Sequence, residues 1–299
     1  MLVDVQIVNA FIDGAAGGNP AGVVVDANAL TEAQKLDVAR QVGVSETAFV
    51  SASDSATIKL DFFTPTRQIA HCGHATIATF SLLRQLGVVG DGRLSKETID
   101  GNREIFVDGD MSFMEQRGPK YTEVTAASDL WARVVASLGP TQAQFPSGVA
   151  PFVVNTGNSF LIVPLPDERS VADLRPDLGL VESISEELDL IGYYVFSTTT
   201  KVPGRHAGAR MFAPRFGITE EAGTGMAAGP LACFLHDHLG VRDREMFIEQ
   251  GWLMQPPSPS VIKVTLEVAD GRISRLMAGG TARAVSSVQV EVCPFVLRT

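Results

Sequence analysis

One strand–loop–helix pattern occurs twice in this chain, once in each half. Residues 63–73 read FTPTRQIAHCG and residues 212–223 read FAPRFGITEEAG. Each copy opens with Phe, a small residue and Pro, and ends on a glycine before an Ala/Leu-rich stretch that closes at Leu-Gly-Val. This repetition indicates two related lobes. If the two helix N-termini face a shared cleft, their backbone N–H groups form a site for an anion.

The composition limits the class of protein. The 299 residues suffice for one large domain or two moderate ones, and 45% hydrophobic residues provide a full core. A net charge of −10 argues against a nucleic-acid partner and an anionic-membrane surface. It does not exclude an anionic small-molecule substrate, because a local cluster of backbone N–H groups can bind one within an acidic protein.

The first residues and the cysteines indicate location and redox state. The segment MLVDVQIVNAF has no basic region, and no apolar stretch approaches the roughly 20 residues of a membrane span. Cys72, Cys233 and Cys293 are widely spaced and form neither a disulfide framework nor a zinc pattern. We therefore expect a cytoplasmic protein with reduced thiols, no membrane or nucleic-acid partner and no metal.

Cap and turn signals divide the chain into many strands and few helices. These signals are a capping box from Thr31 to Gln34, a helix cap at Ser128 with a stop at Gly139, and Asp-Gly hairpins at 108–109 and 270–271. Strands joined by short turns predict an α+β fold with mostly antiparallel pairing. We expect an N-terminal lobe over 1–118, completed by a C-terminal strand at about 281–299, and a C-terminal lobe over 119–280.

Glu46 is the first candidate for chemistry. It stands in VSETAFV, an expected strand over 44–50, where alternation puts it on one face with Val44, Ala48 and Val50. A carboxylate on an apolar face loses hydration, which raises its pKa and prepares it for general acid/base catalysis near neutral pH. The alternative is a Glu at a strand end whose carboxylate reaches water or caps a loop.

The sequence His-Cys-Gly-His at 71–74 is the second candidate. Three potential ligands within four residues rarely point at one ion, so metal binding is not expected. A helix start is the better interpretation, because Gly73 frees the turn and the positive end of the helix lowers the pKa of a thiol such as Cys72. His74 could then donate a proton or a hydrogen bond to an anionic ligand. The alternative is a buried structural thiol beside a His that caps the helix.

The sequence EEAGTGM is the second copy of the glycine turn. Gly223 and Gly225 flank Thr224, so the backbone can approach a carboxylate or phosphate closely. Glu220 and Glu221 stand beside this turn. Because a carboxylate there repels an anion unless it is protonated or binds a cationic group, the pair suits a zwitterionic ligand. The alternative is a plain glycine turn into a helix.

Arginines offer a further route to carboxylate recognition. Arg205, Arg210 and Arg215 each carry a guanidinium that can bind a carboxylate, and the sequence does not choose among them. His236 and His238 fall in the last turn of the second expected helix. Cations at this end suit the helix dipole, so we interpret these two residues as structural.

Several motifs occur together in a fixed order from about residue 5 to 265. They are Gly-Asn-Pro-Ala at 18–21, Ser-Glu-Thr-Ala-Phe-Val at 45–50, Phe-Thr-Pro followed by Cys-Gly-His-Ala-Thr, and Phe-Ala-Pro-Arg-Phe-Gly followed by Gly-Thr-Gly and Ala-Ala-Gly-Pro-Leu. In this combination the chain resembles the PhzF-like (phenazine biosynthesis) isomerase family.

The resemblance implies a fold, a reaction and a set of site residues. The fold is that of diaminopimelate epimerase: two pseudo-symmetric lobes, each a mostly antiparallel sheet or barrel around a central helix, with the active site in the cleft. The reaction is proton transfer without a cofactor; in the name-giving member a Glu moves a proton across a dihydro-hydroxyanthranilate, converting an enol to a ketone. Glu46 matches that Glu, His74 matches the active-site His, and Cys72 is the third candidate catalytic residue. The candidate substrate-binding residues are Asn19, Gly73, Glu221, Gly223, Thr224, Gly225 and Met226.

Several positions depart from the patterns of related families. Glu221 stands where the PhzF-like family has Asp, Met226 where it has Ser, and Pro256 where it typically has Arg. We therefore expect a substrate other than the phenazine precursor. In the related two-thiol epimerases a Cys precedes each glycine loop, whereas here Cys72 fits the first position and Ala222 occupies the second.

Three hypotheses remain open. The leading one is an isomerase of a small carboxylate-bearing acid, an amino acid or a cyclic unsaturated acid, in secondary metabolism, with Glu46 shuttling the proton. The second is an epimerase that uses Cys72 and Glu46 on opposite faces of its substrate. The third is a ligand-binding protein that has lost catalysis. Exposed strand edges in such a sheet-rich protein favour a homodimer.

Overall fold

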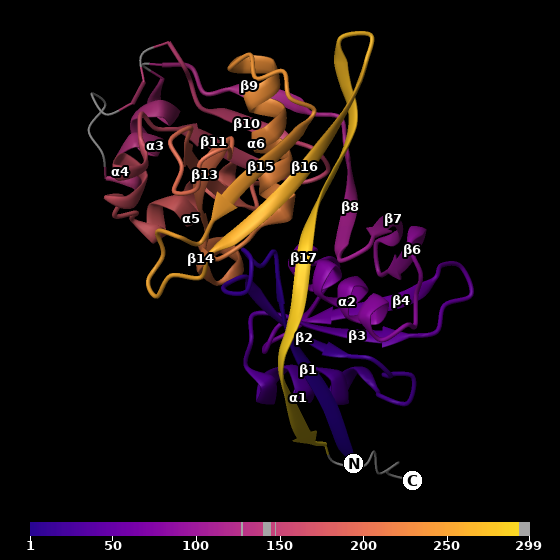
Figure 1. Ribbon diagram of the computed structural model, residues 1–299. Helices are drawn as coiled ribbons and strands as arrows, with labels where there is room; N and C mark the ends of the chain where they lie inside the picture. The colour runs from indigo at the N-terminus through magenta and orange to yellow at the C-terminus, as the bar shows by residue number, and fades with distance from the viewer. Residues whose placement is uncertain (127, 140–144, 147, 293–299) are drawn as a thin grey trace. The chain divides into compact units, whose positions relative to one another are not determined.

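The computed structural model describes residues 1–126, 128–139, 145–146 and 148–292. The chain divides into two compact units (Figure 1). Unit 1 comprises Met1–Ile12, Asn19–Met114 and Gly280–Thr299, and unit 2 comprises Asp13–Gly18 and Glu115–Gly279. The domain bounds expected from the sequence stay a prediction. They are one domain over 1–118 with about 281–299, and a second over 119–280. Residues 293–299 of the expected C-terminal strand, including Cys293, lie outside the described residues.

The strands of unit 1 pair into a closed ring. They are β1 (Leu2–Ala10), β2 (Asn19–Val24), β3 (Thr47–Ser51), β4 (Ile58–Phe63), β5 (Gln68–Ile69), β6 (Gly92–Thr98), β7 (Gly101–Asp108), β8 (Met111–Arg117) and β17 (Arg272–Glu291). The pairs β1–β2, β3–β4, β6–β7, β7–β8 and β1–β17 are antiparallel, and β2–β3 and β4–β6 are parallel. Since β17 also pairs with β8, eight of the described strands close a barrel, and β5 adds to β4.

Helix α2 (Gly73–Gln85) is the central helix of this barrel (Figure 1). Every residue from Gly73 to Leu83 is buried, and the helix contacts β1, β2, β3 and β7. Its Ala, Ile, Leu and Phe residues supply the apolar surface that burial requires, and the buried Thr76 and Thr79 hydroxyls donate to the carbonyls of Cys72 and Ala75. The first loop-helix expected from the sequence is therefore confirmed.

Helix α1 (Glu32–Val42) packs against β3 and β4. The predicted capping box is confirmed, because Thr31 and Gln34 exchange both of its hydrogen bonds. Gly43 ends the helix with φ 72°, a left-handed conformation that suits glycine. The inner face of α1 joins a hydrophobic cluster that includes Val38, Phe49 and Phe63.

The strands of unit 2 form a mostly antiparallel sheet. They are β9 (Lys120–Glu123), β10 (Phe152–Asn155), β11 (Ser159–Pro164), β12 (Gly192–Ser197), β13 (Ala207–Ala213), β14 (Ile218–Glu221), β15 (Glu245–Gln250) and β16 (Ser260–Ala269). Pairing runs β9-β10-β11-β12-β13-β15-β16-β17, with β14 added to β13. Only β11–β12 and β13–β15 are parallel among these described pairs.

Unit 2 also has a central helix. Helix α6 (Gly225–His238) is almost entirely buried and contacts β10, β11, β15 and β16. The other helical segments are α3 (Asp129–Leu138), α4 (Glu168–Ala172), α5 (Leu178–Glu187) and the 3-10 turn η2 (Pro214–Phe216). Ser128 caps α3 and Gly139 ends it, as the sequence predicts. Helices α3 and α5 share a second hydrophobic cluster with β11 and β12 that includes Trp131, Val163 and Tyr193.

Both units thus follow the predicted architecture. Each places strands around one buried helix: α2 begins at Gly73, the last residue of the first copy of the pattern, and α6 begins at Gly225, just after the second copy ends at Gly223. The α+β class with two related lobes is confirmed. His236 and His238 occupy the last turn of α6, as expected.

Local details differ from the sequence expectations at two places. The strand expected over 44–50 begins only at Thr47, because Gly43 leaves α1 in a left-handed conformation and the chain bends before it pairs. Asp108 pairs with Met111, so the turn residues are Gly109 and Asp110 rather than Asp108 and Gly109. The hairpin at 270–271 is confirmed, since Asp270 and Gly271 both have positive φ, at 50° and 72°.

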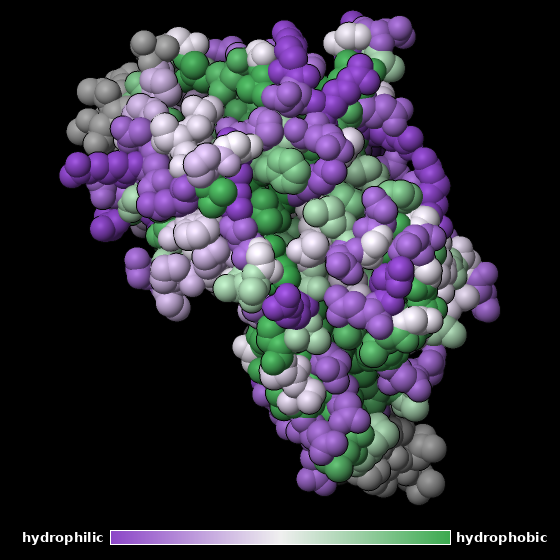
Figure 2. Space-filling model, viewed as in Figure 1, coloured by the Kyte–Doolittle hydropathy of each residue, from purple (hydrophilic) through white to green (hydrophobic). Residues whose placement is uncertain are grey.

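The surface fits the acidic composition. Hydrophilic side chains cover much of the visible face in Figure 2, with hydrophobic side chains between them. Among the described residues, no helix combines the length and the apolar character that a bilayer crossing requires.

Candidate active site

Glu46, Cys72 and His74 meet in unit 1 although they come from two separate segments. Glu46 immediately precedes β3, Cys72 is the N-cap of α2, and His74 lies in the first turn of that helix. Glu46 Oε2 lies 3.3 Å from His74 Nε2, and Cys72 Sγ lies 3.5 Å from His74 Nδ1. The three residues are only 6%, 5% and 4% exposed, respectively. The predicted catalytic residues therefore form one buried cluster with His74 at its centre.

Backbone pairing positions Glu46. Its carbonyl accepts a hydrogen bond from the N–H of Gly22 at 3.0 Å, so the segment is aligned on β2 one residue before β3 begins. A side chain at Gly22 would not fit, because a Cβ there would lie 2.7 Å from Thr47 Oγ1. The alternative in which the Glu46 carboxylate reaches water is wrong, since its side chain is 8% exposed.

The start of α2 positions the other two residues. Cys72 has an extended backbone, with φ −140° and ψ 125°, and its side chain does not cap the helix. The hydroxyl of Thr76 donates to the Cys72 carbonyl at 2.6 Å, which ties the turn to the helix one turn later. The Cys72 thiol is thereby left to contact His74.

Burial raises the pKa of the Cys72 thiol above its ordinary value; Glu46 adds to the increase and His74 opposes it. The sequence prediction of a lowered thiol pKa is wrong, because loss of hydration outweighs the effect of the helix N-terminus. Cys72 therefore keeps its proton near neutral pH and can donate it in a hydrogen bond to His74 Nδ1. With Nδ1 as the acceptor, a neutral His74 carries its proton on Nε2, the nitrogen nearest Glu46.

The same three residues could be considered as metal ligands. One oxygen, one sulfur and one nitrogen atom of the cluster lie within 4.8 Å of one another. However, His74 turns Nδ1 toward Cys72 and Nε2 toward Glu46. Since a His binds one ion through one nitrogen, this arrangement does not suit a metal shared by all three residues.

Asn19 and Gly73 are the other predicted site residues of unit 1. Asn19 begins β2, pairs with Ala10 of β1 and is 4% exposed. Gly73 is the first residue of α2, directly between Cys72 and His74. Gly73 therefore lies by position between two of the predicted catalytic residues, and a substrate-binding role for both Asn19 and Gly73 stays a prediction.

In unit 2 the glycine turn before α6 is held by Gln250, the last residue of β15. Gln250 Nε2 donates to the Glu221 carbonyl at 2.6 Å and to Thr224 Oγ1 at 3.1 Å. Gln250 Oε1 accepts from the N–H of Thr224 at 3.0 Å and from the hydroxyl of Tyr194 at 2.8 Å. One buried amide thus fixes the conformation of the whole turn.

The predicted substrate-binding residues of unit 2 share this turn. The Thr224 hydroxyl donates to the Glu221 carboxylate, and Thr224 is also the N-cap of α6. Met226 Sδ accepts from Asn158 Nδ2 at 3.5 Å. Their role in binding stays a prediction for the whole set: Glu221, Gly223, Thr224, Gly225 and Met226.

Glu220 has a different function from the one expected. Arg210 donates to its two carboxylate oxygens through Nε and Nη2, both at 2.8 Å. The Arg210 side chain is 10% exposed and that of Glu220 is 15% exposed. The prediction that Glu220 and Glu221 act as a pair toward a zwitterionic ligand is therefore wrong, because Glu220 is bound within the protein.

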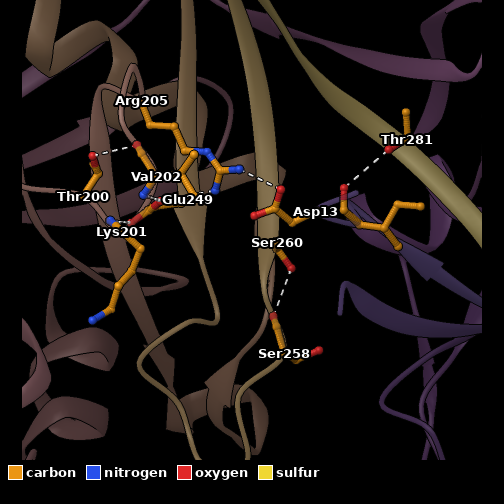
Figure 3. A network of polar contacts seen from close by, with 10 residues as sticks. Asp13, Thr200, Lys201, Val202, Arg205, Glu249, Ser258, Ser260 and Thr281 are labelled. Carbon is orange, nitrogen blue, oxygen red and sulfur yellow. Dashed lines mark hydrogen bonds and ion pairs between the residues drawn. The ribbon is translucent and has the colours of Figure 1, made fainter. Parts of the chain in front are cut away.

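The other two candidate arginines are also ion-paired. Arg205 Nη1 lies 3.2 Å from Glu249 Oε2, and its Nη2 lies 2.6 Å from Asp13 Oδ1. These three side chains are drawn together in Figure 3. Arg215 Nη1 lies 2.9 Å from Asp189 Oδ1. All three guanidinium groups that the sequence offers for substrate recognition are thus engaged by the protein's own carboxylates.

Sequence reasoning missed Gln250 and Tyr194. Both lie within strands and both are buried, at 1% and 0% exposure. Burial strongly raises the pKa of Tyr194, so its hydroxyl stays protonated and can donate to Gln250. A polar residue inside a strand has no spacing signal of its own, so the sequence does not distinguish a buried clamp from an exposed side chain.

Known proteins match this chain over most of its length. The family model described as phenazine biosynthesis-like protein, PhzC-PhzF, matches residues 8–288. The uncharacterized isomerase YddE of Escherichia coli K12 is 30% identical, covering 94% of this chain and 96% of that protein. The trans-2,3-dihydro-3-hydroxyanthranilate isomerase of Pseudomonas chlororaphis is 28% identical, covering 96% of this chain and 93% of that protein. The crystal structure of a PhzF-family phenazine biosynthesis protein from Bacillus anthracis has a TM-score of 0.86 at 26% identity, covering 98% of this chain and 100% of that one.

The match spans both copies of the repeated pattern, both central helices and the Glu46–Cys72–His74 cluster. This chain therefore belongs to the PhzC-PhzF family of phenazine biosynthesis-like proteins.

Proposed function

We propose that this protein is an isomerase that moves a proton, without a cofactor, on a small carboxylate-bearing acid, either an amino acid or a cyclic unsaturated acid. The observation that carries the proposal is the buried chain from Cys72 through His74 to Glu46. Both relatives described above are named isomerases, and the name of one specifies trans-2,3-dihydro-3-hydroxyanthranilate, which supports the reaction class.

In this proposal Glu46 is the group that carries the proton. Its carboxylate removes a proton from a carbon of the substrate. The electron pair of the broken C–H bond forms a new double bond to the neighbouring carbon, and the pair of the existing double bond shifts to the next carbon along. The protonated Glu46 then returns the proton to a different carbon. The substrate is converted to an isomer, and Glu46 is a carboxylate again.

His74 and Cys72 have supporting roles in the same step. His74 Nε2 lies 3.3 Å from Glu46 Oε2, so a proton on this nitrogen stabilises the charge of the carboxylate. Cys72 S–H fixes the tautomer of His74 from the other side. The raised pKa of Cys72 argues against a thiolate base, and therefore against an epimerase that uses Cys72 and Glu46 on opposite faces.

For substrate binding we propose Asn19 and Gly73 in unit 1, and the glycine turn before α6 in unit 2. Glu221 is longer than the Asp that the family resemblance leads one to expect, and Met226 lacks the hydroxyl of a Ser. We infer that the substrate's polar groups differ from those of the phenazine precursor. A homodimer, a cytoplasmic location and a role in secondary metabolism stay predictions.

The test is isotope exchange in D2O. The protein is incubated with trans-2,3-dihydro-3-hydroxyanthranilate and with a panel of amino and hydroxy acids, and products are followed by NMR and mass spectrometry. We expect deuterium in one compound with the wild type and at least a roughly thousandfold slower exchange with Glu46→Gln, because the amide cannot accept the proton. Full turnover by Glu46→Gln would refute the proposal.

Glu182→Gln is the matched control, since Glu182 is an exposed carboxylate on α5 and its replacement should leave exchange unchanged. Binding without exchange is the outcome expected of a non-catalytic ligand-binding protein. Thermal shift with the same panel detects that outcome, and it would contradict the assignment as an isomerase.

A further inference from the structure

Lys96, in β6, is a lysine whose side chain lies fully inside unit 1. Its exposed fraction is 0%. Among the residues that the structure describes, no carboxylate forms an ion pair with it, whereas the other buried lysine of this unit, Lys35, lies 2.5 Å from Asp61 Oδ2. Burying an ammonium group without an anionic partner is unfavourable for folding. The position of Lys96 therefore needs an explanation other than stability.

The Lys96 ammonium contacts the turn His71–His74, which carries two of the proposed catalytic residues, and the helix that follows it. Lys96 Nζ lies 2.6 Å from Thr76 Oγ1 and 3.0 Å from His71 Nδ1, and it stands over the ring of Phe62 at 4.9 Å from the centroid. Burial lowers the pKa of His71 well below its ordinary value, and Lys96 lowers it further. His71 is therefore neutral and can offer Nδ1 as an acceptor to Lys96.

Thr76 extends this contact to the residue that begins α2. Thr76 Oγ1 accepts from Lys96 and donates to the Cys72 carbonyl at 2.6 Å. His71 is bonded directly to Cys72 in the chain. The ammonium thus holds the turn from both sides, through His71 before it and through Thr76 one helical turn after it.

We propose that Lys96 is a positioning residue for proton transfer, which holds the His71–His74 turn so that His74 meets both Glu46 and Cys72. This inference rests on the proposed function. A shift of the Cys72 carbonyl moves the first turn of α2 and with it the His74 ring. Displacements of about 1 Å at such a group can lower turnover by roughly a hundredfold.

The charge of Lys96 changes close to neutral pH. Burial lowers its pKa from 10.5 to about 7, Arg103 lowers it further, and Cys72 opposes the decrease. The titratable and charged groups that face it are His71 and Cys72 from the turn before α2 and Arg103, its cross-strand partner on β7; β4 contributes the Phe62 ring. The hydrogen bonds of the turn are therefore formed by a group whose protonation changes over the pH range in which an acid/base enzyme works.

The first test compares Lys96→Met with Lys35→Met. Both replacements remove a buried lysine of unit 1 and keep a long apolar side chain. For Lys96→Met we expect a higher Tm, a decrease in kcat of roughly 10- to 100-fold and little change in KM. For Lys35→Met we expect the opposite pattern, a lower Tm with wild-type kcat. A lower Tm with wild-type kcat in Lys96→Met would show that Lys96 is only structural.

A second pair of variants tests the path through Thr76. Thr76→Val keeps the shape but removes the hydroxyl, and Thr76→Ser restores it. We expect Thr76→Val to lower kcat as Lys96→Met does, Thr76→Ser to recover it, and the double variant Lys96→Met/Thr76→Val to be no worse than either single variant. Fully additive losses would overturn the path from Lys96 through Thr76.

An NMR measurement separates this inference from the proposed function, because it needs no substrate. The ring 1H–13C signal of His74, assigned with His74→Asn, is followed from pH 5 to 9 in the free protein. We expect its position and its titration to change in Lys96→Met and Thr76→Val but not in Lys35→Met. An unchanged His74 signal in Lys96→Met would refute the positioning role. A wild type without isomerase activity would refute only the proposed function.

Discussion

Cys72, His71 and Lys96 surround the start of α2, and burial is the largest cause of the pKa shift of each. It raises the pKa of Cys72 and lowers the pKa of His71 and Lys96, so that each group favours its neutral form. The neutral Cys72 thiol can donate to His74 Nδ1, and the neutral His71 imidazole can accept from Lys96 Nζ. Chemistry at this turn therefore depends on how completely water is excluded from it.

The first prediction concerns Cys72. If Cys72 only fixes the tautomer of His74, Cys72→Ser keeps a donor at that place and Cys72→Ala removes it. We expect Cys72→Ser to retain most of the exchange rate and Cys72→Ala to lose roughly 3- to 30-fold, far less than Glu46→Gln. The deuterium exchange assay measures all three. A loss in Cys72→Ser as large as that in Glu46→Gln would indicate that the thiol itself transfers a proton.

The second prediction concerns the effect of Lys96 on stability. Its pKa is 10.5 in the unfolded chain and about 7 in the folded protein, so the unfolded chain binds more protons between these pH values. The unfavourable contribution of Lys96 is therefore fully present below pH 7 and decreases as the pH rises toward 10.5. We expect Lys96→Met to be more stable than the wild type by roughly 2–5 kcal/mol at pH 6.

Thermal unfolding of both proteins at pH 6, 7, 8 and 9 measures this difference. The advantage of Lys96→Met should decrease at each step above pH 7. An advantage that stays constant over this range would contradict the lowered pKa of Lys96.

Sequence reasoning found some of these residues and missed others for physical reasons. Glu46 and His74 stand in motifs, and the structure brings them together. Lys96 stands in the strand sequence GRLSKET, where a lysine normally indicates a solvent-facing position. Its burial depends on the barrel closing around α2, which local pattern does not encode. The wrong prediction for Cys72 has the same origin, because the degree of burial is a property of the whole unit.

At the scale of elements, the sequence correctly predicted the helix caps and the turn that depend on interactions within a few residues. The capping box at Thr31, the cap at Ser128 and the turn at Asp270 use side chains and dihedral preferences within a few residues. The start of β3 at Thr47 was not predicted, because it depends on pairing with β2. Likewise the clamp of Gln250 on the turn before α6 joins segments that are far apart in the sequence.

The third prediction concerns the packing of α6. A Cβ at Gly229 would lie 2.3 Å from Gln116 Oε1 and 2.7 Å from Leu276 Cδ1. Gln116 also donates to the carbonyl of Gly225, the first residue of α6, at 2.9 Å. We expect Gly229→Ala to destabilise the protein by about 1–3 kcal/mol, although Ala favours helix more than Gly does.

Denaturant unfolding measures this change, with Gly90→Ala as the control. Gly90 has no atom within 4 Å of an added Cβ, so its replacement should be nearly neutral. Equal stability of the two variants would show that Gln116 can move away at little cost.

At the scale of the whole molecule, the net charge of −10 opposes the approach of an anionic substrate. The fourth prediction follows from this charge. Salt screens the repulsion, so raising ionic strength from about 0.02 M to about 0.3 M should lower KM by roughly 1.5- to 3-fold while kcat stays constant. Steady-state kinetics at several salt concentrations measures both constants. A KM that rises with salt would indicate that a local positive potential outweighs the overall charge.

The long strand β17 has a consequence for how the protein is made. It pairs with β16 over its first half and with β1 over its second half, where Leu2 lies opposite Glu291. During translation β1 leaves the ribosome well before its partner, which emerges only after unit 2 has been made. The barrel of unit 1 cannot close before then, and pairing across so much of the chain is slow. Unit 1 is therefore begun first and finished last, the reverse of the N-to-C order in which domains generally fold during synthesis.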